Sequence, residues 1–186
     1  MPLASAEALA LAGMMGSGKS TVAAILGRLL GRRVVSTDAE LVRRAGKPIA
    51  AVFAEDGEAA FRTLEREVVA SVAGPLVVDL GGGAFCDAEA AARLIATARV
   101  VFLDVSAAEA ARRIAGDPGI GERPLADRWA ALHARRRPLY LRAHHTVEVD
   151  GLAPEAVARR IVDLVGARRR PSGERFLDGE RILGEP

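Results

Sequence analysis

The stretch "ALALAGMMGSGKSTVAAILGRLL", residues 8–30, joins an apolar run, a glycine-rich segment and a helix-like pattern without a break. Its middle part, "GMMGSGKS" at 13–20, matches the pattern G-x-x-x-x-G-K-[ST] in full. In proteins this pattern forms a loop between a strand and a helix, and the loop's backbone N–H groups point inward at phosphate oxygens. The flanking apolar run and helical pattern supply the context that the motif requires. The stretch therefore predicts a nucleotide-binding loop.

Each part of this loop has a chemical task. Its glycines let the backbone curl around a phosphate, and the N-terminus of the following helix adds a positive dipole end. Lys19 supplies an ammonium group for the β- and γ-phosphates, and Ser20 supplies a hydroxyl for Mg²⁺. The loop alone leaves open whether the phosphate passes to water, to a protein or to a small molecule. The predicted nucleotide contacts are Gly13, Gly16, Ser17, Gly18, Lys19, Ser20 and Thr21.

Further apolar runs recur along the chain and alternate with segments of helical spacing. Short continuous apolar strands between helices are typical of a parallel sheet that is covered on both faces. We therefore expect an α/β fold with a five-stranded parallel sheet, and ligands bound beyond the carboxyl ends of its strands. The expected strands are 8–13, 33–37, 75–81, 98–105 and 145–150. The expected helices are 19–30, 39–45 with 49–54, 57–73, 87–96, 107–115, 125–142 and 154–167.

Two segments that contain glycine and proline interrupt the alternation. "AGKPIA" at 45–50 separates two short helices, and "AGDPGIGERPLAD" is expected to form a lid at about 115–127. We assign residues 1–167 to one domain, with substrate-binding helices at about 38–70. Residues 168–186 lose helical periodicity, and we expect them to form a disordered tail.

Composition argues against several classes of protein. The 186 residues have a formal net charge of +2, scattered arginines and only one Trp and one Tyr, which disfavours nucleic-acid binding. No apolar run approaches the length of a membrane span, and the N-terminus lacks the basic start of a signal peptide. Cys86 is the only cysteine, so an internal disulfide is impossible and a cytoplasmic location is expected.

Charged side chains follow the ends of two further expected strands. Asp38 comes just after the second strand, Arg62 lies on a helix beside Phe61, and the glycines of "LGGGAF" at 80–85 follow the third strand. In a sheet whose first strand is central, these places converge near the terminal phosphate. A carboxylate can orient or deprotonate a hydroxyl, and a guanidinium can fork onto a ligand carboxylate. These residues favour a small polyol acid as the phosphate acceptor.

Six stretches, read in order, make the chain resemble the shikimate kinases, within the nucleoside-monophosphate-kinase-like P-loop group. They are "GMMGSGKST", "TDAELV", "GKPIAAVFAEDGEAAFRTLE", "LGGGAF", "RRIAGDPGIGERPL" and "RRRPLY", and the resemblance runs from about residue 8 to 167. It implies a P-loop kinase fold with a small substrate-binding subdomain and a lid. It also implies that the γ-phosphate of ATP, with Mg²⁺, passes to the 3-hydroxyl of shikimate on the route to chorismate. We further expect a monomer that binds shikimate and ATP but no nucleic acid or membrane.

The resemblance implies roles for residues of the substrate pocket. Asp38 would bind the shikimate hydroxyls, including the one that attacks ATP, while Arg62 and Arg136 would clamp the shikimate carboxylate. The glycines after the third strand would leave room for the ring, since a Cβ there would intrude on it. The implied pocket consists of Asp38, Phe53, Phe61, Arg62, Gly81, Gly82, Gly83 and Arg136.

On the nucleotide side, the resemblance implies that Arg123 closes from the lid over the phosphates and that Arg113 flanks adenine. Lys19, Asp38 and Arg123 would then be the catalytic residues. "GLAPEAV" at 151–157 lacks an arginine that the family often places against adenine, although Pro154 is retained.

The chain departs from the family pattern after the second strand. The family usually carries a D-x-D pair there, whose first aspartate helps to hold Mg²⁺ through water, but this chain reads Ser36-Thr37-Asp38. Asp79, two residues before Gly81, ends the third strand beside the nucleotide loop. We hypothesise that Asp79 replaces the missing charge near Mg²⁺. The alternative is a structural aspartate that caps the hydrogen bonds of the loop.

Plainer interpretations compete with these assignments. Asp38 could be a helix N-cap, Arg62 could lie on a solvated helix face, and a neighbour of Arg136 could be the clamp. The whole chain could be a related kinase, such as one for gluconate, or a catalytically weak nucleotide-binding module. Three histidines have no metal-like partners and are expected at the surface or in loops: His133, His144 and His145.

Overall fold

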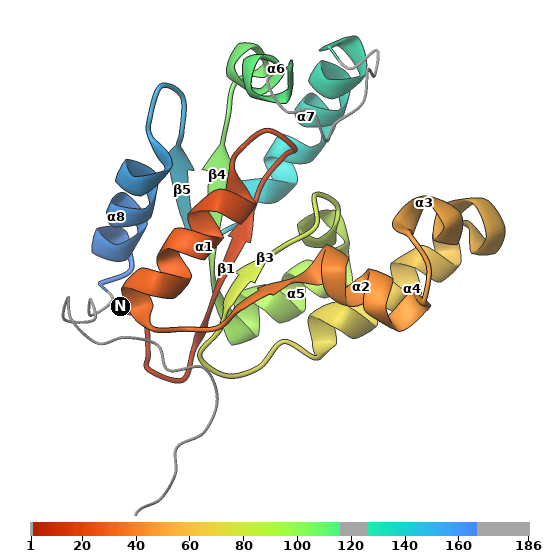
Figure 1. The fold of residues 1–186 in the computed structure, drawn as a ribbon, viewed down its shortest axis with the longest axis horizontal. Coiled ribbons are helices and arrows are strands. Elements are labelled where there is room, and N and C mark those ends of the chain that lie inside the picture. The colour runs from red at the N-terminus through yellow and green to blue at the C-terminus, as the bar shows by residue number, and fades with distance from the viewer. Residues whose placement is uncertain (1, 116–125, 167–186) are drawn as a thin grey trace, which may run out of the picture.

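Five parallel strands in the order β2-β3-β1-β4-β5 form the central sheet of the computed structural model (Figure 1). The structure describes residues 2–115 and 126–166, except the side chains of 126–128. The expected sheet, with its first strand in the centre, is confirmed. The lid segment therefore lies largely outside the described residues, and the tail at 168–186 lies wholly outside them. The strands are β1 (Ala8–Ala12), β2 (Val34–Ser36), β3 (Val77–Asp79), β4 (Ala98–Asp104) and β5 (His145–Glu148).

Helices connect the strands, and the expected helices are present, although the one at 49–54 is α-helical only in part. The connections after β1, β2 and β3 each carry helices before the next parallel strand, as parallel pairing requires. The helices are α1 (Lys19–Leu30), α2 (Thr37–Ala45), α3 (Ile49–Ala51), α4 (Gly57–Ala70), α5 (Ala88–Thr97), α6 (Ala107–Ala115), α7 (Ala126–Tyr140) and α8 (Pro154–Leu164), with short turns η1 (Val52–Asp56) and η2 (Ala84–Cys86).

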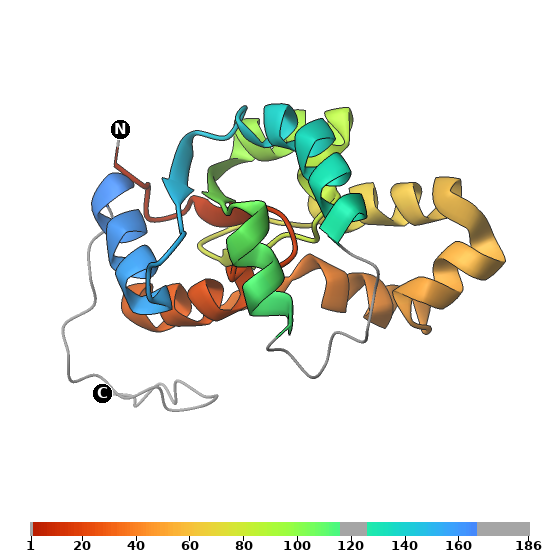
Figure 2. The ribbon, with the colours of Figure 1, turned by 90° about the horizontal axis from the view of Figure 1, so that it is seen from above.

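Helices cover both faces of the sheet. In Figure 2, α1 and α8 lie side by side on one face, while α5 and the C-terminal part of α7 lie on the other. Because both faces are covered, every residue of β1 is buried, and Leu9, Ala10 and Leu11 have no exposed surface. This explains why β1 reads as a continuous apolar run and shows no alternation. The helices cover the faces of the sheet and not its carboxyl edge, so the polar residues that follow β1, β2 and β3 lie at that edge.

Residues 37–70, which we call the acceptor arm, fold back and forth beside the carboxyl end of β2 (Figure 1). The arm has an apolar cluster of its own, separate from the main core, that consists of Leu41, Val52, Phe61 and Val68. The predicted helix at 49–54 is only partly correct. After the three residues of α3, the chain widens into the π-helical turn η1, which ends at Gly57 with φ +82°. This positive φ suits glycine. The sequence contains no side-chain pattern that distinguishes a π-helical turn from an α-helical one here.

Candidate active site

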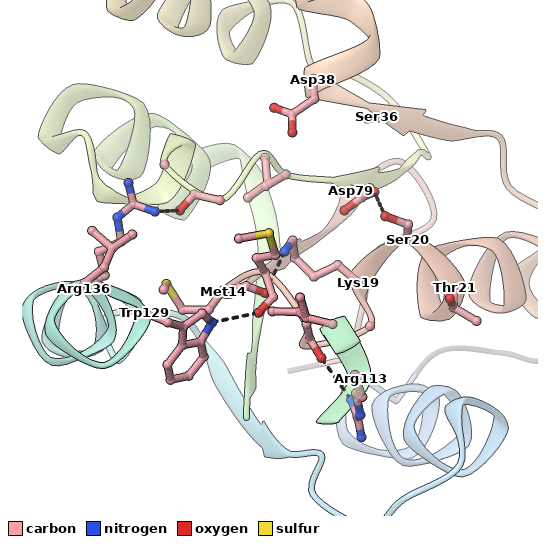
Figure 3. Close-up of a pocket in the computed structure, with 18 of the residues that line it drawn as sticks. Met14, Lys19, Ser20, Thr21, Ser36, Asp38, Asp79, Arg113, Trp129 and Arg136 are labelled. Carbon is pink, nitrogen blue, oxygen red and sulfur yellow. Dashed lines mark hydrogen bonds between the residues drawn. The ribbon is translucent and has the colours of Figure 1, made fainter. Parts of the chain in front are cut away.

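A cavity of 1060 Å³ lies at the carboxyl ends of the strands. The loop after β1 forms one side, and the acceptor arm, the glycines after β3 and helix α7 form the other. Figure 3 shows Lys19, Asp38 and Arg136 around this space. A cavity at this end of a doubly wound sheet is where ligands of such folds bind. None of the described helices has both the length and the apolar composition that a membrane crossing requires.

The nucleotide loop has the backbone that its glycines predict. Gly13, Gly16 and Gly18 have φ of 150°, 85° and 85°. A Cβ on Gly13 would lie 2.8 Å from the carbonyl oxygen of Leu103 in β4, so the loop could not pack against the sheet. Gly18 is in the left-handed conformation immediately before α1, so the first N–H groups of that helix face the loop.

Lys19 lies folded over the loop that it belongs to. Its Nζ donates hydrogen bonds to the carbonyl oxygens of Gly13 at 2.9 Å and Met14 at 3.2 Å. Burial lowers the pKa of Lys19, and the nearby carboxylates of Asp79 and Asp38 oppose this effect. The ammonium group is therefore held inside the cavity at the point where phosphates would enter.

Ser20 and Asp79 are joined by a side-chain hydrogen bond. Ser20 Oγ donates to Asp79 Oδ2 at 2.6 Å, although the two residues come from α1 and β3 (Figure 3). Asp79 is 9% exposed and lines the cavity. Hydroxyl and carboxylate oxygens are the donors that Mg²⁺ prefers, so this pair fits a hard divalent cation. Among the described residues, no group of three or more His, Cys, Asp or Glu side chains could hold a metal alone.

The three glycines after β3 each face one of the three charged side chains expected to bind the substrate. A Cβ on Gly81 would overlap Asp38 Oδ1, and a Cβ on Gly83 would lie 2.7 Å from Arg62 Nη1. A Cβ on Gly82 would lie 3.8 Å from Arg136 Nη1. We expected the glycines to make room for a ring. The immediate reason at Gly81 and Gly83 is different, because a Cβ there would displace the side chains beside the ring site.

Asp38 lies in the first turn of α2 with its carboxylate against Gly81. Its interpretation as a helix N-cap is wrong, because Ser36 Oγ accepts the hydrogen bond from the N–H of Ala39 at 3.3 Å. Burial raises the pKa of Asp38, with Asp79 acting in the same direction and Lys19 against it. A carboxylate with a raised pKa is a stronger base, which suits a group that receives a proton from a hydroxyl.

Arg62 is held in place by a buried acid. Its Nη1 donates to Glu65 Oε2 at 2.7 Å, and Glu65 is only 3% exposed. Burial raises the pKa of Glu65, while the guanidinium of Arg62 lowers it. Arg62 also lies over the ring of Phe61, which stacks on Phe53 at 4.2 Å between ring centroids. A solvated helix face does not describe this residue, since Arg62 and both rings line the cavity.

Arg136 is the member of its arginine triplet that lines the cavity. Its Nη1 donates to the carbonyl oxygen of Gly82 at 3.1 Å, which leaves its remaining donors for a ligand. Arg135 is exposed, and Arg137 instead donates to Asp104 from Nε at 3.0 Å and from Nη2 at 2.8 Å. Tyr140, one turn further along α7, donates to the same carbonyl of Gly82.

Arg113 lies against the outside of the nucleotide loop. Its Nη1 donates to the carbonyl oxygens of Gly16 at 3.4 Å and Ser17 at 3.3 Å, and its Nη2 donates to Val149 at 2.7 Å. Arg113 lines the cavity together with residues 151–154, where a base bound beyond the loop would lie. Arg123 falls outside the described residues, so its role in the lid stays a prediction.

Three features of the site escaped the sequence analysis. Thr37 is 2% exposed, and its Oγ1 accepts the N–H of Gly81 at 2.7 Å. Trp129, 4% exposed, donates from Nε1 to the carbonyl oxygen of Met15 at 3.1 Å. Glu65 was visible one turn after Arg62, and this spacing is the signal that could have identified it. The contacts of Thr37 and Trp129 join residues far apart in the chain, so no local pattern marks them.

The three histidines differ in their surroundings. The ring of His133 stacks on Trp129 at 4.7 Å between centroids and its Nε2 lies 3.6 Å from Asp104 Oδ1. His144 Nδ1 accepts the N–H of Val100 at 3.1 Å. The expectation of surface or loop positions is wrong for His133, because its partly buried ring stacks on Trp129 within helix α7. It is correct for His144, which is exposed in the bend before β5, and wrong for His145, which is partly buried on β5 itself. Cys86 is partly buried and packs against the main core.

The sheet, the glycine-rich loop and the facing set of charged side chains define a P-loop phosphotransferase with a built-in acceptor pocket. The family model for shikimate kinase matches residues 15–165 of the chain. The chain belongs to the shikimate kinase family.

Relatives and solved structures agree with this placement. A shikimate kinase of Thermobifida fusca (strain YX) is 45% identical over 157 residues, or 81% of this chain and 90% of the relative. The structure of a shikimate kinase from Acinetobacter baumannii in complex with shikimate has a TM-score of 0.79 and 32% identity, and the match covers 86% of this chain and 93% of that one. A gluconokinase from Sinorhizobium meliloti 1021 has a TM-score of 0.56 at 17% identity, covering 87% of this chain and 93% of that one. This last likeness shows the fold alone.

Proposed function

We propose that the protein is an ATP-dependent shikimate kinase, which transfers the γ-phosphate of ATP to the 3-hydroxyl of shikimate. The observation that carries the proposal is the convergence of Asp38, Arg62 and Arg136 on the glycines after β3, across one cavity from the nucleotide loop. Two guanidinium groups and one carboxylate around bare backbone match an acceptor that has one carboxylate and several hydroxyls. Membership of the shikimate kinase family supports the same conclusion.

On the acceptor side, Arg62 and Arg136 bind the substrate carboxylate and so fix the orientation of the ring. Asp38 accepts a hydrogen bond from the attacking hydroxyl and receives its proton as the oxygen bonds to phosphorus. The bond between the γ-phosphorus and its bridging oxygen breaks at the same time, and ADP leaves with the electron pair. The raised pKa of Asp38 suits this acceptance of a proton.

On the nucleotide side, the N–H groups of the loop and the N-terminus of α1 hold the phosphates. Lys19 neutralises charge on the transferring group, and its position inside the cavity means that little reorganisation is required. Arg113 supports the loop from outside beside the expected adenine position. We propose that Arg123 closes over the phosphates from the lid.

Phosphoryl transfer from ATP needs a divalent cation, and we propose Mg²⁺ held by Ser20 and, through water, by Asp79. Their oxygen donors fit this ion. Bound there, the cation would supply Lewis-acid chemistry by withdrawing negative charge from the phosphate groups. The chain's own residues then position the acceptor and receive its proton.

A coupled assay of ADP release tests the proposal directly. ADP release by the full chain should depend on shikimate, and phosphorus NMR of the product should show a phosphate on the 3-oxygen. Release with gluconate but not shikimate would favour the related kinase, and release with neither would favour a nucleotide-binding module. We further propose that the protein is a cytoplasmic monomer, and light scattering on the purified chain would measure its mass in solution.

A further inference from the structure

Positions 36 and 79 lie side by side at the cavity end of the sheet. They are register partners across the parallel pair β2 and β3, and both line the cavity. Register partners in a sheet send their side chains to the same face, at the same level along the strands. Ser36 still has extended backbone, with φ −94° and ψ 124°. A side chain on either position therefore leaves the sheet toward the same region.

The side chains at the two positions make different contacts in this chain. A carboxylate oxygen of Asp79 lies 2.6 Å from Ser20 Oγ. Of the nearby carboxylates, Asp79 does most to raise the pKa of the buried Lys19. Ser36 is uncharged, and its Oγ caps helix α2 by accepting the N–H of Ala39. The acid beside Ser20 thus comes from β3, whereas its neighbour on β2, Ser36, caps helix α2.

We propose that Asp79 is the carboxylate that holds the nucleotide-bound metal, and that position 36 is an equivalent place for it, one strand away at the same register. Mg²⁺ in such sites takes one or two carboxylates and completes its shell with water and phosphate oxygens, so one acid from either strand suffices. The inference rests on the proposed function, because the ligand is a complex of metal and nucleotide. It adds that β3 supplies the negative charge and that the charge can be moved from position 79 to position 36.

The local structure at position 36 can accept an aspartate. An aspartate at position 36 keeps the N-cap of α2, because Asp caps helices as well as Ser does. Its charge also lies at a helix N-terminus, where a negative charge is favoured. Asparagine at position 36 caps equally well without charge, and so provides a matched control.

The test is metal binding, measured without an acceptor. Electron paramagnetic resonance of free Mn²⁺ would give the affinity of the full chain's ADP complex for Mn²⁺, and calorimetry would give ADP affinity in the absence of metal. Asp79→Asn should weaken Mn²⁺ binding by about 10- to 100-fold. Ser36→Asp combined with Asp79→Asn should restore it to within about threefold of the wild type. Ser36→Asn combined with Asp79→Asn should restore nothing.

Two results would overturn the inference: unchanged Mn²⁺ affinity in Asp79→Asn, or no recovery in the variant with Ser36→Asp. If Asp79→Asn fails to fold, Ser36→Asp alone decides, since a second carboxylate at the same level should tighten Mn²⁺ binding by roughly fivefold. Equal or weaker binding in that variant would also overturn the inference. The assay contains no shikimate, so a failure of the proposed acceptor would leave the metal result intact, and the reverse holds as well.

Discussion

Adding one methyl group at each of the three glycines after β3 should produce three different effects. All three lie outside the left-handed region of backbone space, so alanine can adopt their conformations and the added Cβ is the only change. At Gly81 the Cβ overlaps the carboxylate of Asp38, a short side chain with little freedom to retreat. At Gly83 it comes within 2.7 Å of Arg62 Nη1, and at Gly82 it meets nothing closer than 3.8 Å.

The sizes of the effects follow from these distances. A shift of about 1 Å in a catalytic group costs roughly 100-fold, so Gly81→Ala should lower kcat/KM for shikimate by about 100-fold, or ~2.7 kcal/mol. Gly83→Ala moves the far end of a long side chain that Glu65 still holds, so it should raise KM for shikimate by about tenfold. Gly82→Ala should change neither parameter by more than about threefold.

The assay is steady-state ADP release with shikimate varied at saturating ATP, together with calorimetric titration of ADP into each variant. ADP affinity should stay unchanged throughout, because each added Cβ lies nearest to an acceptor side chain, and the Cβ on Gly82 comes no closer to the nucleotide loop than 3.9 Å, at the carbonyl oxygen of Gly13. If Gly82→Ala were as damaging as Gly81→Ala, the steric reasoning would be refuted. A parallel loss of ADP affinity would show instead that the glycine segment supports the nucleotide loop.

The remaining predictions concern three side chains. Burial raises the folded-state pKa of Asp38 above its unfolded value, so at neutral pH the buried charge opposes folding. Asp38→Asn should therefore raise Tm, while the loss of the proton acceptor should lower kcat by about 100-fold or more. For the same reason kcat/KM of the wild type should fall with decreasing pH at a point above the ordinary aspartate pKa, and a profile flat down to the ordinary value would contradict this. Glu65→Gln removes the charged partner of Arg62 and should raise KM for shikimate about tenfold with ADP affinity unchanged, and an unchanged KM would refute that role. Trp129→Phe loses the hydrogen bond to Met15 and should lower the free energy of unfolding by about 1 kcal/mol in denaturant titrations, with no loss expected if that bond were unimportant.

Much of the fold could be predicted because its signals are local. The loop at 13–20 has a fixed pattern, and the apolar runs of β1 and β4 are long enough to indicate buried strands. The convergence of the residues after β2 and β3 was expected for a sheet whose first strand is central, and β1 does lie in the centre of the sheet. The wider turn η1 was missed, since α-helical and π-helical spacing differ too little in five residues.

The details of the site depend on contacts that spacing does not encode. Gly81 and Asp38 are 43 positions apart, and only the packed structure shows that the glycine makes room for the carboxylate. Thr37 looks like an ordinary first residue of helix α2, yet its hydroxyl accepts a hydrogen bond that fixes the position of Gly81. Such residues are recognised by what they touch, and that information arises only when the sheet has brought distant segments together.

The apolar cluster of the acceptor arm gives the protein a second, smaller hydrophobic core beside the main one. Substitutions that reshape the pocket for a different acid can be absorbed within Leu41, Val52, Phe61 and Val68, without disturbing the packing beneath the nucleotide loop. The chemistry common to all such kinases is thus insulated from the part that chooses the acceptor. On this basis, a lineage can change its substrate by altering the arm while it keeps the same phosphate-transferring machinery.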